Sequence, residues 1–305
     1  MTRAPLLAIG LACLALGLGS GCQTLRGVAE TGAEALAAGG VISDDQAGAI
    51  RRSGEALADA FETLTPEQEY YVGRTVAALL TTRYTVYEDP RLQIYINTLG
   101  QALALHADVP ETFAGYFFLV LDSDEINAFA APGGFILVTR GMLRICRTED
   151  ELAAVLAHEI AHVQHRHGLQ SIRRSRWTGA VATLAAETAK TLGSEELAEL
   201  TQAFEGVISD ITATLVNRGY SRAFEREADR SAVRILARTG YDPRALVTML
   251  EQMETRLPAS GPGFTKTHPP PRSRIREIRP LIPAGEPPPP VLTRHARFRQ
   301  HLDGV

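Results

Sequence analysis

The chain has 305 residues, of which 45% are hydrophobic and 22% are charged, and its formal net charge is −4 at pH 7. This length and apolar content suffice for one large globular domain, or for one domain with extensions. The slightly acidic balance argues against a nucleic-acid partner, because nucleic-acid-binding proteins carry a strongly basic surface.

The N-terminus has the pattern of a targeting signal. Arg3 supplies a positive charge, the apolar run 6–18 is too short to cross a bilayer, and the small residues 19–21 precede Cys22. Small residues followed by a cysteine resemble the bacterial lipobox, in which the cysteine becomes the lipidated N-terminus. We therefore expect residues 1–21 to be a lipoprotein signal peptide and Cys22 to be the lipidation site. The alternative is an ordinary secretory signal with an incidental cysteine.

The residues after the signal predict an anchor and a compartment. Gln23, rather than an aspartate, follows the cysteine, and by the same resemblance this favours the outer membrane of a bacterial cell envelope, with the protein facing the periplasm. Residues 22–64 are rich in small residues and poor in large apolar ones, so we expect a lipid-anchored tether. With Cys13 removed and Cys22 lipidated, Cys146 is left alone and no intramolecular disulfide is expected.

The folded domain is expected to begin at Thr65, a helix N-cap followed by a proline. Apolar periodicity predicts helices over about 65–80 and 89–106. Two short runs rich in strand-forming residues, at 116–121 and 135–139, then predict a small, mostly antiparallel sheet.

The most informative stretch is 152–167, LAAVLAHEIAHVQHRH. His158 and His162 are four residues apart on a predicted helix, so both imidazoles can reach one zinc ion at about 2.0–2.1 Å. Glu159 can reach a metal-bound water as a general base without being a ligand. The alternative, two histidines on a solvated helix face, conflicts with the apolar stripe that places this helix in a core. Gly168 is the expected end of the helix.

A catalytic zinc site needs a third protein ligand. The helix predicted over 221–238 carries Glu225 and Asp229 on one face, while Glu227 is about 200° away around the helix. Glu225 is therefore the expected third ligand. Asp229 is expected to accept a hydrogen bond from the outer ring nitrogen of a ligand histidine. Taken alone this acidic pair would indicate a solvated face, but the two histidines still lack a ligand.

These motifs resemble the HtpX-like and CAAX-prenyl-protease-like zinc metallopeptidases, a gluzincin group. The resemblance runs from about residue 65 to 278 and includes HEIAH, RH at 166–167, NAFAAPGGFILVTRGML at 127–143, YSRAFEREAD at 220–229 and THPPPRSRI at 267–275. It implies an α+β fold, mainly helical and zincin-like, with the small sheet beside the HExxH helix. It also implies an endopeptidase with one zinc ion (Zn2+) per chain, in a domain over 65–280.

The resemblance extends to further site residues. The family's strand beside the cleft, which would hold the substrate as an added strand, corresponds to Gly133, Gly134, Phe135, Ile136, Leu137 and Val138. A plain core strand is the other interpretation, and both can hold. His268 resembles a family histidine that holds or blocks the metal's open position, and Arg274 matches a family arginine near the site. The alternative for these two is a proline-stiffened loop followed by a short basic helix. Tyr220, His268 and Arg274 are all candidates for stabilising the oxyanion.

Two segments are less informative. Residues 169–216 are helical in pattern and rich in small residues, which suits a lid, a membrane-facing pair or, as the favoured interpretation, packing. Residues 281–305 form a proline-rich, basic tail that we expect to be flexible or a docking arm. The sequence has no transmembrane pattern in the domain, so the resemblance is to the short, lipid-anchored periplasmic members.

The resemblance implies the quality control of misfolded or misassembled envelope proteins. Its partners would be protein or peptide substrates, the membrane through the N-terminal lipid, and the outer-membrane assembly machinery. The alternative function is a lipid-anchored, chaperone-like binding factor for outer-membrane assembly, with a latched or structural zinc site.

Overall fold

The computed structural model describes residue 43 and residues 64–172, 205–256, 267–282 and 291–305. Leu64–Val305 form one compact unit. The predicted signal peptide, Cys22 and most of the tether lie outside the described residues, as does most of the segment for which a lid was considered. Among the described residues, no helix is both long and apolar enough to span a membrane.

Both helices predicted at the start of the domain are confirmed. Helix α3 spans Pro66–Arg83 and α4 spans Pro90–Ala104. The side chain of Thr65 accepts a hydrogen bond from the Gln68 backbone at 3.2 Å, and the Gln68 side chain accepts one from the Thr65 backbone at 3.0 Å. This reciprocal cap satisfies two backbone donors at the helix start, which explains why the boundary was readable in the sequence.

The sheet has three strands in the order β1-β3-β2. Strand β1 (Phe117–Leu121) pairs in parallel with β3 (Phe135–Thr139), and β2 (Ala128–Ala131) pairs with β3 in antiparallel orientation. The sheet is therefore mixed, where a mostly antiparallel one was expected. The difference arises because an unpredicted strand, β2, lies between the two predicted ones in sequence and pairs on the far side of β3.

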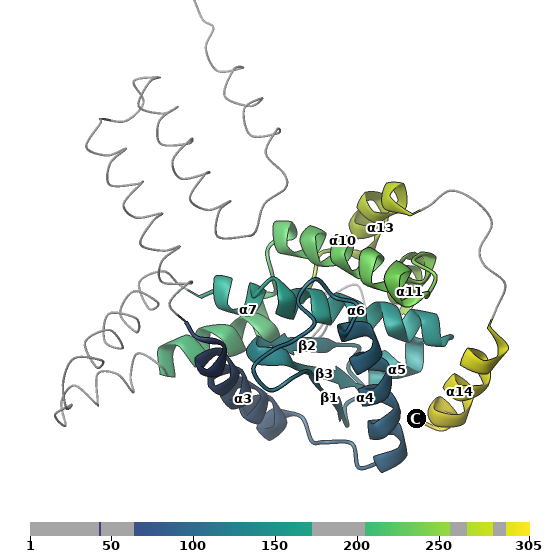
Figure 1. Cartoon of the computed structure of the whole chain (residues 1–305), viewed down its shortest axis with the longest axis horizontal. Helices are drawn as coiled ribbons and strands as arrows, with labels where there is room; N and C mark the ends of the chain where they lie inside the picture. The colour runs from purple at the N-terminus through teal and green to yellow at the C-terminus, as the bar shows by residue number, and fades with distance from the viewer. Residues whose placement is uncertain (1–42, 44–63, 173–204, 257–266, 283–290) are drawn as a thin grey trace, which may run out of the picture. The chain divides into compact units, whose positions relative to one another are not determined.

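The two faces of the sheet are covered by different helices. Phe118, Ile136 and Val138 point into the main core with α4 and the central helix α6 (Glu149–Gln164). The strand residues between these point to the opposite face of the sheet, where α3 packs against β2 and β3. On that face the ring of Phe129 lies 5.3 Å from that of Tyr84. Figure 1 shows α3 on the opposite side of the sheet from α6. This layering confirms the predicted α+β, mainly helical fold.

Helix α6 lies at the centre of the domain, so nearly every residue from Glu149 to Val163 is buried rather than only one apolar stripe. It packs against α10 (Arg222–Thr239), α11 (Arg244–Arg256), α4 and strand β2. The expected stop at Gly168 is wrong. The helix ends at Gln164, Arg166 adopts a left-handed conformation with φ 54°, and Gly168 lies inside the short helix α7 (His167–Gln170).

The C-terminal part of the chain packs on the domain, where the sequence left a flexible tail and a docking arm as alternatives. Helix α13 (Pro271–Ile278) and the turn η4 (Arg279–Leu281) are followed, after undescribed residues, by α14 (Leu292–Leu302). Residues 291–305 are thus not a flexible tail, because α14 buries Phe298 in the main core and its Arg297 pairs with the buried Glu149 at the start of α6. Further contacts hold this helix against the domain, including the stacking of the His301 ring on that of Tyr95 and the pairing of Arg294 with Asp150.

Candidate metal centre

Four side chains from three separate parts of the chain meet in the interior. His158 and His162 lie on α6, Glu225 on the first turn of α10, and His268 on the segment before α13. All four are buried, and each offers one ligand atom within 4.8 Å of the others. The predicted set His158, His162 and Glu225 is therefore brought together, and His268 joins it as a fourth member.

The spacing of these atoms fits a small cation. The Nε2 atoms of His158 and His162 are 3.1 Å apart, and the Glu225 carboxylate oxygens lie 3.5 Å from His162 Nε2, 3.6 Å from His268 Nε2 and 3.7 Å from His158 Nε2. Ligands held tetrahedrally about 2.0–2.1 Å from a zinc ion are about 3.3 Å from one another. Both Glu225 oxygens are buried, yet neither accepts a hydrogen bond from a described residue. A cation would satisfy them.

Asp229 and Arg274 lie behind His158. Asp229 Oδ1 is 3.0 Å from His158 Nδ1, the ring nitrogen that faces away from the cluster. The guanidinium of Arg274 binds both carboxylate oxygens of Asp229, at 2.9 and 2.6 Å. Asp229 is thus where the sequence predicted it. Arg274 neutralises the buried carboxylate, and its other terminal nitrogen is 3.7 Å from Glu225.

Burial sets the protonation of the cluster. It lowers the pKa values of His162 and His268 well below the usual value, with neighbouring histidines adding to the shift. Neutral imidazoles are the form that binds metals. Burial opposes ionisation of Asp229, but Arg274 and His158 together hold the pKa of that carboxyl below its ordinary value.

Glu159 is the predicted general base, and it faces a small cavity. The cavity has a volume of about 10 Å³ and is lined by Glu159, Ala130, Tyr220 and His268, among others. This is close to the space that one water needs. Burial raises the pKa of Glu159 to about 8, with Arg274 opposing the shift. A carboxyl group with such a pKa can exchange a proton with water near neutral pH.

One wall of this cavity is formed by two segments that are joined by a backbone hydrogen bond. Residues 214–220 include the π-helical turn η3 (Thr214–Arg218), and the backbone N–H of Tyr220 donates to the Thr267 carbonyl at 3.2 Å. Gly219 approaches Thr267 so closely that a Cβ atom there would lie 2.1 Å from its carbonyl oxygen. In this conformation the site has room for a water but not for a peptide.

The predicted substrate-binding strand is corrected by the sheet topology. Phe135, Ile136, Leu137 and Val138 belong to β3, which is paired on one side with β1 and on the other with β2. Its backbone groups are used within the sheet, so no substrate strand can be added to it. Gly133 and Gly134 are also buried away from the cluster. Gly133 packs on the backbone of α3, and Gly134 packs on residues 112–116.

The strand beside the cavity is β2. Ala128, Phe129 and Ala130 line the cavity, and no described strand pairs with the outer edge of β2. The Ala130 carbonyl points to that edge, because it accepts a hydrogen bond from the Tyr220 hydroxyl at 3.3 Å. This strand was not predicted from the sequence, because alanines have low strand propensity. The Pro132 that follows it was the available signal of a strand end.

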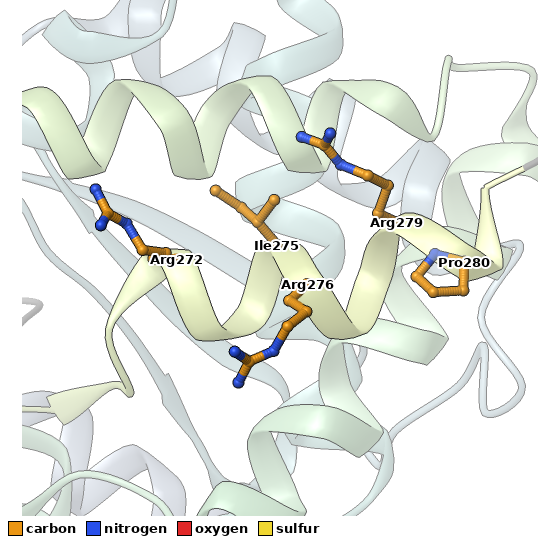
Figure 2. A pocket seen from close by; sticks show the side chains of 5 residues that line it. All are labelled: Arg272, Ile275, Arg276, Arg279 and Pro280. Atoms are coloured by element: carbon orange, nitrogen blue, oxygen red, sulfur yellow. The ribbon is translucent and has the colours of Figure 1, made fainter.

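A larger hollow lies elsewhere and contains none of the predicted site residues. It has a volume of about 470 Å³ and is lined by Arg272, Ile275, Arg276, Arg279 and Pro280. Figure 2 shows Arg276 extending to the other side of α13 from Arg272 and Arg279. Arg272 and Arg279 pair with Glu254 and Glu251. The hollow is open surface on α13.

The chain is similar to known peptidases. A family model described as peptidase family M48 matches residues 90–282. The chain is 33% identical over 228 residues to the beta-barrel assembly-enhancing protease of Escherichia coli (strain K12), and 34% identical over 230 residues to a putative beta-barrel assembly-enhancing protease of Vibrio cholerae. Each alignment covers 72% of this chain and 45% of the relative.

A more distant group of relatives is mitochondrial. The metalloendopeptidase OMA1 of Schizosaccharomyces pombe is 33% identical over 166 residues, which are 52% of this chain and 44% of that protein. The chain thus spans less than half the length of these relatives. The family model covers more than half of the chain and includes His158, His162, Glu225 and His268. The chain therefore belongs to peptidase family M48, as its HEIAH and EREAD motifs predicted.

Proposed function

We propose that this protein is a zinc-dependent endopeptidase that hydrolyses peptide bonds of misfolded or misassembled cell-envelope proteins. The observation that carries the proposal is the buried convergence of His158, His162 and Glu225 beside Glu159 and a water-sized cavity. His158, His162 and Glu225 would hold one zinc ion. A zinc ion at this place would act as a Lewis acid on the substrate carbonyl and would lower the pKa of a bound water to near 7.

The chain's own groups then have definite tasks. Glu159 takes the proton of the attacking water and returns it to the leaving amine. Asp229 holds His158 in the tautomer that leaves Nε2 without a proton, and Arg274 keeps Asp229 ionised. Tyr220 and Arg274 are both within the site and remain the candidates for stabilising the oxyanion.

We also propose that the substrate adds as a strand to the outer edge of β2. The Ala130 carbonyl, now bonded to the Tyr220 hydroxyl, would accept a backbone N–H of the substrate. The cavity, at about 10 Å³, is too small for a peptide, so Tyr220 and the residues of η3 would move aside before a peptide enters.

A second function has one observation in its favour. His268 completes a four-ligand set, and a zinc ion with four protein ligands has no open position, as in structural sites. A lipid-anchored binding factor for outer-membrane assembly, with a latched or structural zinc, would have the same arrangement of four ligands. If the protein is a peptidase, His268 must leave the metal during turnover.

One experiment separates the two functions. Zinc content and casein cleavage are measured for the wild type, Glu159→Gln and His268→Ala in a soluble form that begins at Gln23. The peptidase predicts one zinc per chain in each, no cleavage by Glu159→Gln, and faster cleavage by His268→Ala. Zinc without cleavage in both the wild type and His268→Ala would favour the binding factor. Absence of zinc from the wild type would contradict both.

The place of action is a further proposal. We propose that residues 1–21 are a signal peptide, that Cys22 carries the lipid, and that residues 22–64 tether the domain to the outer membrane on its periplasmic side. The similarity to beta-barrel assembly-enhancing proteases supports a partner in outer-membrane assembly. Cys22→Ser should move the protein from the membrane fraction to the soluble one. A variant that matures normally would instead support an ordinary secreted enzyme.

A further inference from the structure

One completely buried histidine, His167, has no role in the site described above. It is the first residue of α7, and its Nδ1 atom lies 2.8 Å from the Nδ1 atom of His162. On a continuous helix, residues five apart would be about 140° from each other. The left-handed conformation of Arg166 ends α6 and turns His167 back onto His162. The ring of Phe224 stacks on His167 at 4.4 Å, nearly parallel.

The protons along this contact can be assigned from the partners. His162 Nε2 faces the cluster, 3.1 Å from His158 Nε2, and must be without a proton to bind a metal. Neutral His162 therefore carries its proton on Nδ1 and donates it to Nδ1 of His167. His167 must then carry its own proton on Nε2, which lies 3.3 Å from the Glu227 carboxylate.

The far end of this chain of hydrogen bonds is at the surface. The side chain of Glu227 is 49% exposed, so its carboxylate stays in water while it accepts from His167. The carboxylate can therefore accept the hydrogen bond from His167 Nε2 while it is also solvated. The order of donors is thus His162, His167, Glu227.

We propose that His167, oriented by Glu227, is a positioning residue that fixes the tautomer and direction of His162 as a metal ligand. The proposal rests on the metal site proposed above. It gives the two histidine ligands different supports, since His158 donates directly to the carboxylate of Asp229, whereas His162 donates to a neutral imidazole. Asparagine keeps an acceptor close to the position of Nδ1, and leucine keeps much of the volume without an acceptor.

The test compares His167→Leu and His167→Asn with the matched control variant His165→Leu. His165 also contacts Glu227, at 3.4 Å, and its ring stacks on that of His167, but its other nitrogen bonds Ser231 rather than a ligand. The zinc Kd of each full chain is measured by chelator competition, and the melting temperature is measured in the presence of chelator. The absorption spectrum of each cobalt-loaded chain reports the geometry of the ligands.

Loss of a hydrogen-bond partner of a ligand histidine commonly weakens metal binding about 10–100-fold. We expect His167→Leu to raise the Kd by about that factor and to change the cobalt spectrum. His167→Asn should recover most of the affinity, and His165→Leu should stay within about 3-fold of the wild type. If His167→Leu does not fold, Glu227→Ala provides the second test and should raise the Kd by several-fold.

Three results would overturn the proposal. One is a zinc Kd of His167→Leu, or of Glu227→Ala where that variant is used, that equals the Kd of the wild type. Another is equal loss of affinity in the asparagine and leucine variants, together with equal lowering of their metal-free melting temperatures, which would indicate packing alone. The third is an equal effect of His165→Leu. Cleavage reports separately on the proposed function, since a wild type that binds zinc without cleaving casein leaves these Kd ratios unaffected.

Discussion

Asp229 is a buried anion with two different partners. It accepts a hydrogen bond from His158, a proposed metal ligand, at 3.0 Å and a bidentate contact from Arg274. A carboxylate in this position raises the basicity of the ligand and fixes its direction. Its negative charge is tolerated in the interior because the guanidinium is adjacent.

Asp229→Asn should therefore weaken zinc binding more than it weakens the fold. The asparagine carbonyl can still accept from His158, but the charge that balances Arg274 is lost. We expect the zinc Kd to rise about 10–100-fold in a chelator competition. Asp122→Asn is the matched control, since Asp122 is an exposed carboxylate paired with Arg140. An unchanged Kd in Asp229→Asn would contradict the role of this carboxylate.

Among the elements, β2 has the most direct connection to function. Phe129 and Ala131 bond to β3, so the backbone groups of Ala128 and Ala130 point to the outer edge by the alternation of a strand. A substrate strand bound there would use every second backbone N–H, whatever its side chains are.

Peptide substrates with single N-methylated bonds test this pattern. Methylation should raise KM by about 10-fold or more at alternate positions near the scissile bond, because each removes one hydrogen bond and adds a clash. The intervening positions should have KM values close to that of the parent peptide, which serves as the control. A KM profile without a two-residue period would contradict binding along β2.

Helix α14 depends on a partner in the active-site helix. Arg297 pairs with the buried Glu149, which also accepts hydrogen bonds from the hydroxyls of Tyr95 and Tyr241 at 3.0 and 2.8 Å. Glu149 is the first residue of α6 and its carboxylate is buried. The guanidinium of Arg297 supplies the counter-charge beside it.

Arg297→Met should lower the free energy of unfolding by about 1–3 kcal/mol, because Glu149 loses its counter-charge. The value lies below that of a fully buried pair because the arginine side chain is 47% exposed. Arg299→Met on the same helix removes only an exposed contact with Asp303 and should change the stability by less than about 0.5 kcal/mol. Denaturant unfolding measures both, and equal effects would show that Glu149 does not need Arg297.

The elements that could be predicted from sequence are those whose boundaries depend on local chemistry. Helices α3, α4 and α10 follow the N-cap residues Thr65, Asp89 and Ser221, whose side chains cap the first turn, and α10 is followed by Gly240 in the left-handed conformation. Strand β2, the parallel pairing of β1 with β3, and the docking of α14 depend on distant partners. No local pattern carries that information, so these features were missed or misassigned.

The features of the site divide in the same way into those set by local sequence and those set by distant contacts. His158, His162, Glu225 and Asp229 were placed by helical spacing, which is a local property. The substrate edge proposed on β2 required the strand order, and the contact of His167 with His162 required the left-handed turn at Arg166. Neither can be obtained from spacing along one helix.

Across the whole molecule, one exposed carboxylate connects the loop after α4 to α10. Asp108 binds Arg238 and Arg234 at 2.6 and 3.2 Å. The hydrogen bond from Arg238 is the main cause of a lowered pKa of Asp108 in the folded chain. A lowered folded-state pKa adds stability above the ordinary value of 3.8, and this stability is lost as the pH falls through the folded-state pKa.

Asp108→Asn should therefore be less stable than the wild type at pH 7 by about 0.5–1 kcal/mol, the usual range for an exposed pair. The difference should shrink as the pH falls below the ordinary pKa of an aspartate and vanish when both chains are neutral at this position. Thermal unfolding from pH 7 to pH 3 measures it. A difference that is constant over this range would assign the effect to packing rather than to charge.

The cluster takes its members from α6, α10 and the segment before α13, so it depends on the order in which the chain is made. A ribosome releases His158 and His162 well before Glu225, and Arg274 after both. A nascent chain that stops short of Glu225 has half of the cluster's side chains and cannot close it. If the cluster is the zinc site proposed above, hydrolysis needs a chain that extends beyond Glu225.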